Sequence, residues 1–254
     1  MVGRKITFDN KKNNPDVLVI AAHPDDDVIG LGTILYRHSK NNDNIKVVFV
    51  TNGSRGNGAS WRVKVNESKR RSEVRFREAV QALSLINIPK ENIFCLGYPD
   101  GGTQRYLKNM SEDIQTLILK FNPGRIYVHC IEGGHLDHDM TSYVVKFICS
   151  KIGYSNVFEW TEYHPKQPLG SQHVKFLPSY SSKQKEIKVD ISEEERNLKR
   201  KMLAFHHSQD VEKIYLQGEA IRQANTFELE KELYEHCQLP KRKLRPIVKD
   251  LINL

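Results

Sequence analysis

The fold is decided by the stretch VLVIAAHPDDD at residues 17–27. Its first part is a β-branched, apolar run that predicts a buried strand. Pro24 and the aspartates that follow it then open a helical segment. In that segment the apolar residues recur at helical spacing: Val28, Leu31, Ile34 and Leu35. His23 is therefore expected where a strand meets a helix.

The same alternation continues along the chain to residue 163. Further strands are predicted at 45–50, 92–96, 125–130 and 157–163, with helical segments between them. Asn87 is expected to end one helix in the left-handed conformation, and Ser111 to cap the start of the next. Strands that alternate with helices are typical of an α/β fold, here a Rossmann-like, doubly wound, mostly parallel sheet.

The chain after residue 163 has a different character. Residues 164–190 are rich in Pro, Ser, Lys and Gln, and residues 192–205 then predict a charged helix. This part holds too few apolar residues for a core of its own. We therefore expect a catalytic core at 1–163 and an appended C-terminal α/β lobe at 164–254, packed on the core as one single domain.

The net charge of +8 is concentrated in two segments, residues 62–77 and 241–254. A protein that binds nucleic acid is expected to spread such charge over a face and to interleave aromatic residues. Only Trp61 and Phe76 lie in or beside these segments. The pattern argues against a nucleic-acid partner and indicates a solvated helix face and a basic tail.

Other features of the composition argue against a membrane protein and against a disulfide scaffold. No apolar run approaches the ~18 residues of a membrane span, and residues 1–10 lack the apolar stretch of a secretory signal. The four cysteines form no CxxC pair, so we expect them to be reduced. A cytoplasmic protein is the expectation.

Two short motifs carry the chemistry, AHPDD at 22–26 and HLDH at 135–138. Each follows an apolar strand, and ligands bind outside the carboxyl ends of the strands in open α/β sheets. Together the motifs supply imidazoles and carboxylates, which suit zinc and, less selectively, Fe(II) or another divalent metal. Three protein ligands would leave one position open for a water of lowered pKa.

The spacing within each motif allows different roles. His23 and Asp26 can converge on one ion, which leaves Asp25 free to accept a proton from water as a general base. Of His135 and His138, one can ligate while the other faces the substrate, with Asp137 fixing the tautomer of the second ring. The alternative is that these aspartates have no role in chemistry and only stabilise the N-terminus of a helix.

These residues resemble the PIG-L/LmbE-like zinc-dependent de-N-acetylases, which remove acetyl groups from N-acetylglucosamine-type amines. The resemblance covers residues 17–145. It rests on AHPDD at 22–26, HLDHD at 135–139, TNG at 51–53, LGYPDGG at 96–102, and the helical set Arg75, Glu78 and Ala82.

The resemblance implies a role for each matched residue. It implies that His23, Asp26 and His138 hold the metal and that Asp25 is the general base. It implies that His135 stabilises the oxyanion and protonates the leaving amine. Arg75 and Asp100 would contact the sugar.

Three positions depart from the family pattern: Asp27 replaces a frequent Glu, Leu136 a common Pro, and Asn87 a Gly. Asp27 is shorter than Glu behind the metal ligands, so the anchoring of the motif is expected to change. Two other positions have competing explanations. Arg75 can form an exposed ion pair with Glu78, and Asp100 can simply serve its turn.

The predicted function is metal-dependent hydrolysis of the acetyl amide of an N-acetylated amino sugar, giving acetate and a free amine. One alternative is a Mg-dependent phosphoryl-transfer site at the acidic triplet Asp25–Asp27. The histidines of the second motif argue against it, because Mg²⁺ prefers oxygen ligands. Another is a nucleotide-binding module, although no GxGxxG or Walker A sequence follows any strand. His129 is expected to be a core residue. The sequence does not fix the substrate, the oligomeric state, or whether His206 or His207 reaches the pocket.

Overall fold

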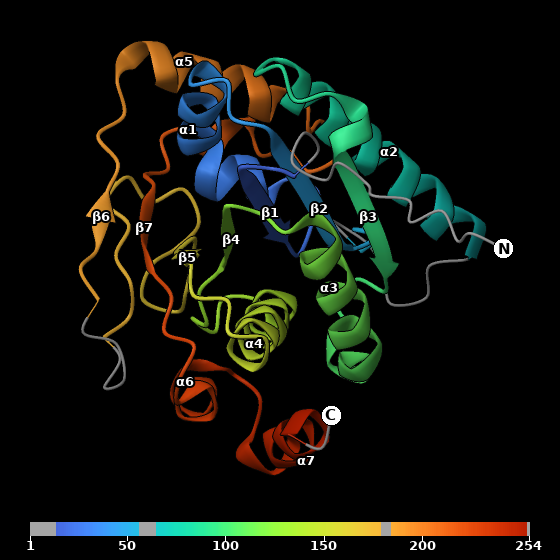
Figure 1. The fold of residues 1–254 in the computed structure, drawn as a ribbon. Helices are drawn as coiled ribbons and strands as arrows, with labels where there is room; N and C mark the ends of the chain where they lie inside the picture. Colours follow the sequence, from blue (N-terminus) through green and yellow to red (C-terminus); the bar gives the residue numbers. More distant parts are fainter. Residues whose placement is uncertain (1–13, 56–64, 179–183, 253–254) are drawn as a thin grey trace, which may run out of the picture.

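The computed structural model describes residues 14–55, 65–178 and 184–252 (Figure 1). The expectations for residues 1–10, and for Arg62 and Lys64 in the basic segment 62–77, concern residues outside these ranges. A single sheet of seven strands forms the centre, in the order β3-β2-β1-β4-β5-β7-β6. The strands are β1 (Val17–Ala21), β2 (Ile45–Thr51), β3 (Ile93–Tyr98), β4 (Arg125–His129), β5 (Val157–Trp160), β6 (Ile187–Lys188) and β7 (Ala220–Gln223).

The first five strands run parallel, and β7 is antiparallel to both of its neighbours. The order 3-2-1-4-5 is that of a Rossmann fold. The predicted α/β class with a mostly parallel, doubly wound sheet is therefore confirmed.

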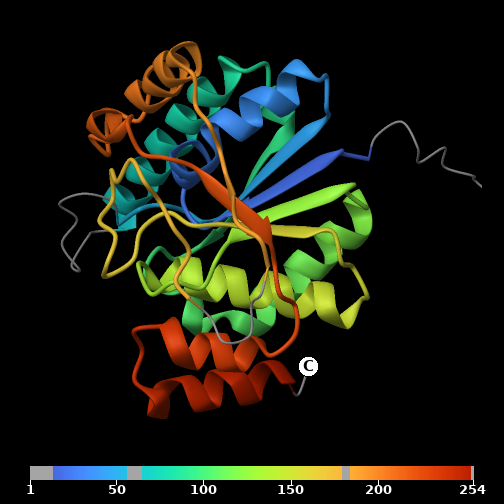
Figure 2. The same ribbon diagram turned by 90° about the vertical axis from the view of Figure 1, so that its left-hand side faces the viewer.

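Helices cover both faces of the sheet (Figures 1 and 2). One face carries α1, α2 and α5, and the other carries α3 and α4 with α6 and α7 outside them. The helices are α1 (Asp26–Lys40), α2 (Val65–Ser84), α3 (Leu107–Phe121), α4 (Leu136–Lys151), α5 (Glu193–Ala204), α6 (Leu229–His236) and α7 (Lys241–Ile252), with 3₁₀ turns at Lys90–Asn92, Thr103–Arg105 and Glu212–Ile214. β1 is apolar and completely buried because helices pack on both of its sides.

The sheet has its topological switch point between β1 and β4. From β1 the chain moves to β2 and β3 on one side, and it later returns to β4 on the other side. The connections that leave the carboxyl ends of β1 and β4 therefore diverge and open a crevice between them. His23 follows β1 and His135 follows β4, so this arrangement brings the two motifs together.

Two of the local signals agree with the structure and one does not. Asn87 has a φ of +58°, the left-handed cap that was expected. The charged helix predicted at 192–205 is α5, and a capping box of Ser192 and Glu195 begins it. The predicted helix start at Ser111 is wrong, because α3 begins at Leu107 and the Ser111 hydroxyl instead donates to the Leu107 carbonyl inside the helix.

The segment after residue 163 joins the sheet as well as packing on it. It supplies β6 and β7, which extend the sheet beyond β5, and it supplies α5, which packs against α1 and α2. The predicted division at residue 163 stays a prediction.

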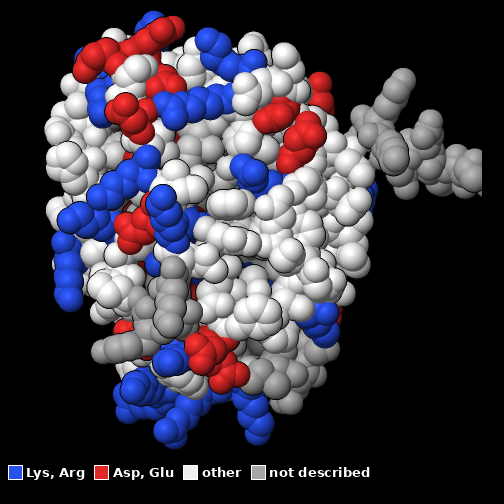
Figure 3. Space-filling view, turned by 60° about the vertical axis from the view of Figure 1, so that its left-hand side comes forward, with Lys and Arg blue, Asp and Glu red and all other residues white. Residues whose placement is uncertain are grey.

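The C-terminal helix α7 explains the basic tail. Leu244, Ile247 and Val248 are buried, while five basic residues face outward. These are Lys241, Arg242, Lys243, Arg245 and Lys249, and Lys and Arg side chains gather at this end of the molecule in Figure 3. Within the described residues, no helix combines the length and the apolar character that crossing a membrane requires.

Candidate functional site

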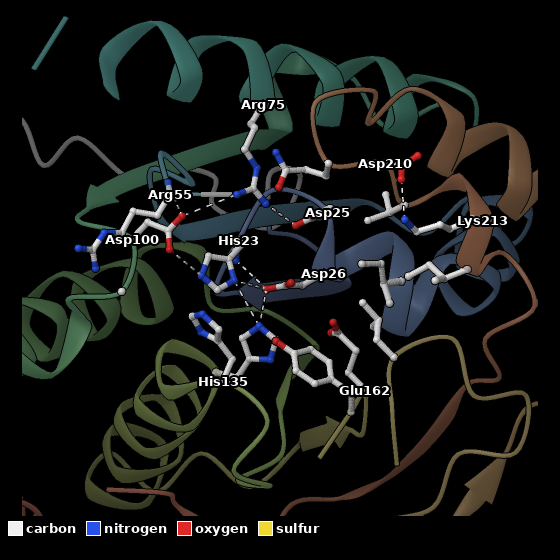
Figure 4. Close-up of a pocket in the computed structure, with 18 residues that line it drawn as sticks. His23, Asp25, Asp26, Arg55, Arg75, Asp100, His135, Glu162, Asp210 and Lys213 are labelled. Atoms are coloured by element: carbon white, nitrogen blue, oxygen red, sulfur yellow. Dashed lines mark hydrogen bonds and ion pairs between the residues drawn. The ribbon is translucent and has the colours of Figure 1, made fainter. Parts of the chain in front are cut away.

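A cavity of about 510 Å³ opens at the crevice between β1 and β4 (Figure 4). Both sequence motifs and the residues assigned to the sugar line it. Seven of the nine predicted site residues are among its lining residues: His23, Asp25, Asp26, Arg75, Asp100, His135 and His138. The other two, Asp27 and Asp137, lie behind its wall.

Three donor atoms of the two motifs meet at one point. His23 Nδ1 lies 3.2 Å from Asp26 Oδ2, and His138 Nε2 lies 3.3 Å from each of these atoms. Ligand atoms on a tetrahedral ion with bonds of about 2.0–2.1 Å are roughly 3.3 Å apart. The three side chains are almost fully buried. Their spacing and their N,N,O chemistry therefore fit one divalent metal ion.

The site concentrates negative charge around His23. Its Nε2 lies 3.2 Å from Asp137 Oδ2 and 3.4 Å from Asp100 Oδ1. Burial disfavours a charged ring, but Asp26, Asp100 and Asp137 outweigh burial and raise the pKa of His23 well above its ordinary value. Burial likewise opposes ionisation of Asp26, yet the neighbouring imidazoles hold its pKa well below its usual range. Such an environment stabilises a cation.

Asp137 orients a different ring from the expected one. Its carboxylate contacts Nε2 of His23 and accepts hydrogen bonds from Gly101 N at 2.6 Å and from the hydroxyl of Thr103 at 2.6 Å. The prediction that it fixes a histidine of its own motif through this carboxylate is wrong. A carboxylate on Nε2 leaves Nδ1 of His23 free to ligate, which is the usual arrangement behind a metal-binding histidine.

His135 is held by the backbone of its own helix. As the N-cap of α4, it accepts a hydrogen bond on Nδ1 from Asp137 N at 3.2 Å. In the neutral ring the proton is therefore on Nε2. Burial, together with the charges of His23 and His138, lowers the pKa of His135 to about 4. At neutral pH His135 thus presents an N–H donor in a cavity wall.

Asp25 is fixed by Arg75, which reaches down from α2 (Figure 4). Arg75 Nη2 lies 2.7 Å from Asp25 Oδ1, and Nη1 donates to the Gly53 carbonyl at 2.8 Å. Glu78 instead accepts hydrogen bonds from the backbone and the hydroxyl of Ser208. The alternative of an exposed Arg75–Glu78 pair is wrong.

Asp100 both stabilises its turn and lines the cavity, as its two alternative explanations required. It accepts a hydrogen bond from Arg55 N at 2.8 Å, which stabilises its turn. It also lies in the cavity, 3.7 Å from Arg75 Nη1. Its place next to His23 and Arg75 makes it part of the site.

Two further residues contact or line the site although the sequence did not assign them to it. His129 is buried, as expected of a core residue, but its Nε2 lies 3.1 Å from Ala22 N and 3.2 Å from Asp26 Oδ2. Its ring also stacks on His138 with centroids 3.9 Å apart. Glu162 lines the cavity, and burial with its acidic neighbours raises its pKa well above the ordinary value. Both lie near the carboxyl ends of the strands predicted at 125–130 and 157–163, the same edge of the sheet at which His23 was expected.

Other sequence candidates lie away from the cavity. Asp27 is buried with a raised pKa, because burial and the charges of Asp25 and Asp26 disfavour its ionisation. Neither of its carboxyl oxygens has a hydrogen-bond partner among the described residues. His206 is buried and His207 is exposed, and neither lines the cavity.

The segment after residue 163 closes the far side of the cavity. Leu169, Gln209, Val211 and Ile214 line it, and Asp210 and Lys213 form an ion pair there at 2.5 Å. In Figure 4 this pair lies opposite Arg55 and Asp100. The cavity therefore has one wall from the core and one from the C-terminal segment.

Solved structures share this fold. Teicoplanin deacetylase Orf2, in its zinc inhibited form, gives a TM-score of 0.63 at 16% identity, covering 81% of this chain and 96% of that chain. The N,N'-diacetylchitobiose deacetylase from Pyrococcus horikoshii gives 0.58 at 20% identity, with 93% and 92% covered. GalB, the 4-carboxy-2-hydroxymuconate hydratase from Pseudomonas putida, gives 0.57 at 17% identity, with 79% and 82% covered. These low identities establish the fold alone.

A comparison with curated proteins found no match. A comparison with protein families matches residues 18–149 to the family described as PIG-L: GlcNAc-PI de-N-acetylase. The match spans more than half of the chain, including most of β1 and both motifs of the site. The chain therefore belongs to the PIG-L family.

Proposed function

We propose that this protein is a metal-dependent amide hydrolase that removes the acetyl group of an N-acetylated amino sugar. The observation that supports this most strongly is the convergence of His23, Asp26 and His138 at 3.2–3.3 Å, with Asp25 lining the same cavity. The family description and the two deacetylases of the same fold support the same reaction class.

His23, Asp26 and His138 would hold the ion. Zinc is the metal that two imidazoles and one carboxylate favour, with Fe(II) or another divalent metal as the alternative. When bound, such an ion supplies Lewis acidity and lowers the pKa of a coordinated water to about 7.

Asp25 accepts a proton from the attacking water. Arg75 engages Oδ1 of Asp25, which leaves Oδ2 to take this proton. The water oxygen bonds to the amide carbon and stays in the acetate product. The proton taken by Asp25 then passes to the amide nitrogen as the C–N bond breaks, so that the amine leaves as a neutral group.

His135 acts on the carbonyl oxygen. Because Nδ1 accepts from Asp137 N, the neutral ring offers its Nε2–H to the oxygen that gains negative charge during attack. A ring of lowered pKa thus serves as a hydrogen-bond donor, and it relays a proton to the amine only if it first receives one from Asp25. The resemblance implies that His135 itself protonates the leaving amine, whereas here we propose that the proton comes from Asp25.

The polar wall suits a sugar. Arg55, Arg75 and Asp100 place donors and acceptors on the core side of the cavity, and hydroxyl groups require both. An N-acetylated amino sugar bound there would present its acetamide to Asp25 and His135.

The test is an assay of acetate release from N-acetylated amino sugars with the metal-loaded protein. Asp25→Ala is expected to lower kcat by about 10²–10⁴ and to retain the metal. His138→Ala is expected to lose metal, whereas the exposed His207→Ala serves as its matched control and retains both metal and activity. Full activity of either site variant would contradict the proposal. So would hydration of an unsaturated acid without any acetate release, the outcome expected of a hydratase such as GalB.

A further inference from the structure

A second cavity, of about 240 Å³, adjoins the first and shares Arg75 and Gln209 with it. Three guanidinium groups line it, those of Arg70, Arg71 and Arg75. Ser54, Ser208 and Gln209 add hydroxyl and amide groups. Among the described residues that line this cavity, none is a carboxylate.

The three arginines come from one side of α2, at positions i, i+1 and i+5. Arg75 is buried and bound to Asp25 and Gly53. Arg71 pairs with Glu67 at 2.6 Å, with side chains 34% and 47% exposed. A pair so exposed on a helix contributes little to stability. A ligand can therefore recruit Arg71 at little cost.

Arg70 has no such partner. It is exposed, and no ion pair involves it in the part of the chain that the structure describes. Two guanidinium groups, those of Arg70 and Arg71, are thus available at the cavity that adjoins the candidate active site. Both belong to the segment 62–77 that was expected to form a solvated helix face, and both line the same cavity as Arg75.

We propose that this cavity is a subsite for a phosphate ester carried by the amino sugar whose acetyl group is removed in the first cavity. This inference rests on the proposed function. The planar, charged fork of an arginine matches the oxygens of a phosphate in a bidentate manner. Concentrated positive charge at the entrance to a cavity also raises the association rate of an anionic substrate. The substrate class is therefore a phosphorylated N-acetyl amino sugar.

The kinetic test compares N-acetylglucosamine with its 1-phosphate and its 6-phosphate. With the metal-loaded protein, one of the phosphorylated sugars is expected to have at least about a tenfold higher kcat/KM, as one charge-assisted hydrogen bond supplies. The preferred ester shows which carbon of the sugar, C1 or C6, faces α2. The preference is expected to fall as salt is raised.

Arg70→Gln combined with Arg71→Gln is expected to lower this selectivity ratio about tenfold or more. Arg77→Gln is the control, because it removes one positive charge, half of the change in the double variant, from an exposed position of α2 that lines neither cavity. Its selectivity ratio should equal that of the unaltered protein. Arg75 is left intact in this test because it holds Asp25.

A binding measurement separates this inference from the proposed function. Inorganic phosphate, titrated into the metal-loaded protein by calorimetry, is expected to bind the Arg77→Gln variant and to bind the Arg70→Gln/Arg71→Gln variant at least tenfold more weakly. Acetate release with no preference for either ester, and phosphate binding equal in the two variants, would overturn the subsite and leave the deacetylase intact. Phosphate binding that depends on Arg70 and Arg71, without acetate release from any sugar, would support the subsite and overturn the proposed function.

Discussion

Arg75 and Asp25 form a buried ion pair between two elements 50 residues apart, with Arg75 Nη2 2.7 Å from Asp25 Oδ1. Arg75 lies in the middle of α2, and Asp25 is the N-cap of α1. Arg75 lines both cavities. One guanidinium group therefore fixes the proposed base and also borders the proposed phosphate subsite.

The first prediction concerns this pair. Arg75→Met is expected to lower kcat at least tenfold, because Asp25 loses the group that orients it. It is also expected to lower the free energy of unfolding by about 3–5 kcal/mol, the usual effect of leaving a buried charge unpaired. Arg75→Lys should recover part of the stability but less of kcat, since an ammonium group does not reproduce the fork to both Asp25 and Gly53. Acetate release and urea unfolding measure the two effects, and an unchanged kcat in Arg75→Met would refute the positioning role.

Much of the fold could be predicted from local patterns. The strand at 17–22 is apolar without alternation, which is typical of a strand buried on both faces, and it is β1, which lies inside the sheet between β2 and β4. Because both motifs follow strands, the rule for open α/β sheets placed them at one crevice without any knowledge of contacts. The convergence of His23 with His138, 115 residues later, follows from this topology.

What the sequence did not predict are the contacts set by packing. β6 has only two residues, Ile187 and Lys188, and both are exposed, so neither length nor apolar pattern marks it as a strand. The target of Asp137 depends on how α4 approaches β1, a distance of 114 residues along the chain. The start of α3 was misplaced because Ser111 suits a cap, whereas here its hydroxyl bonds back to the preceding turn.

The second prediction concerns Asp137. Asp137→Asn keeps the size of the side chain but removes the charge that faces Nε2 of His23. Metal affinity is expected to fall by about 10–100-fold, the usual effect of altering a group behind a metal-binding histidine. Competition with a chelator, followed by metal analysis, measures this change. Asp113→Asn, a substitution of an aspartate that bonds to Tyr98 instead, is the matched control, and equal affinities in the two variants would argue against the orienting role.

The third prediction uses two glycines of α1 that lie two residues apart. A Cβ at Gly30 would lie 2.3 Å from the Trp160 ring, whereas a Cβ at Gly32 would meet nothing closer than 3.5 Å. Gly30→Ala is therefore expected to destabilise the protein by at least about 1–3 kcal/mol through overpacking. Gly32→Ala should be neutral or stabilising by up to about 1 kcal/mol, because alanine favours the helix. Urea unfolding of both variants tests the packing of α1 on β5, and equal effects would contradict it.

The fourth prediction is a pH dependence at the contact between α1 and α5. Arg37 Nε lies 2.7 Å from Glu195 Oε1, and this hydrogen-bonded pair lowers the pKa of Glu195 from 4.5 to about 2. A carboxyl whose pKa is lower in the folded state stabilises the protein above its unfolded pKa, and this contribution is lost as the pH falls from about 4.5 toward 2. Because Arg37 is 46% exposed, the contribution is expected to be at most about 1 kcal/mol.

Glu195→Gln isolates the charge, since glutamine can keep the capping box with Ser192. The variant is expected to be less stable than the unaltered protein at pH 7, and the difference should shrink steadily between pH 4.5 and pH 3. Urea unfolding at several pH values, with a double-mutant cycle through Arg37→Gln, separates the pair from other effects of either substitution. A difference in the free energy of unfolding that is the same at pH 7 and pH 3 would show that the ion pair does not stabilise this contact, because only the ionised Glu195 can attract Arg37.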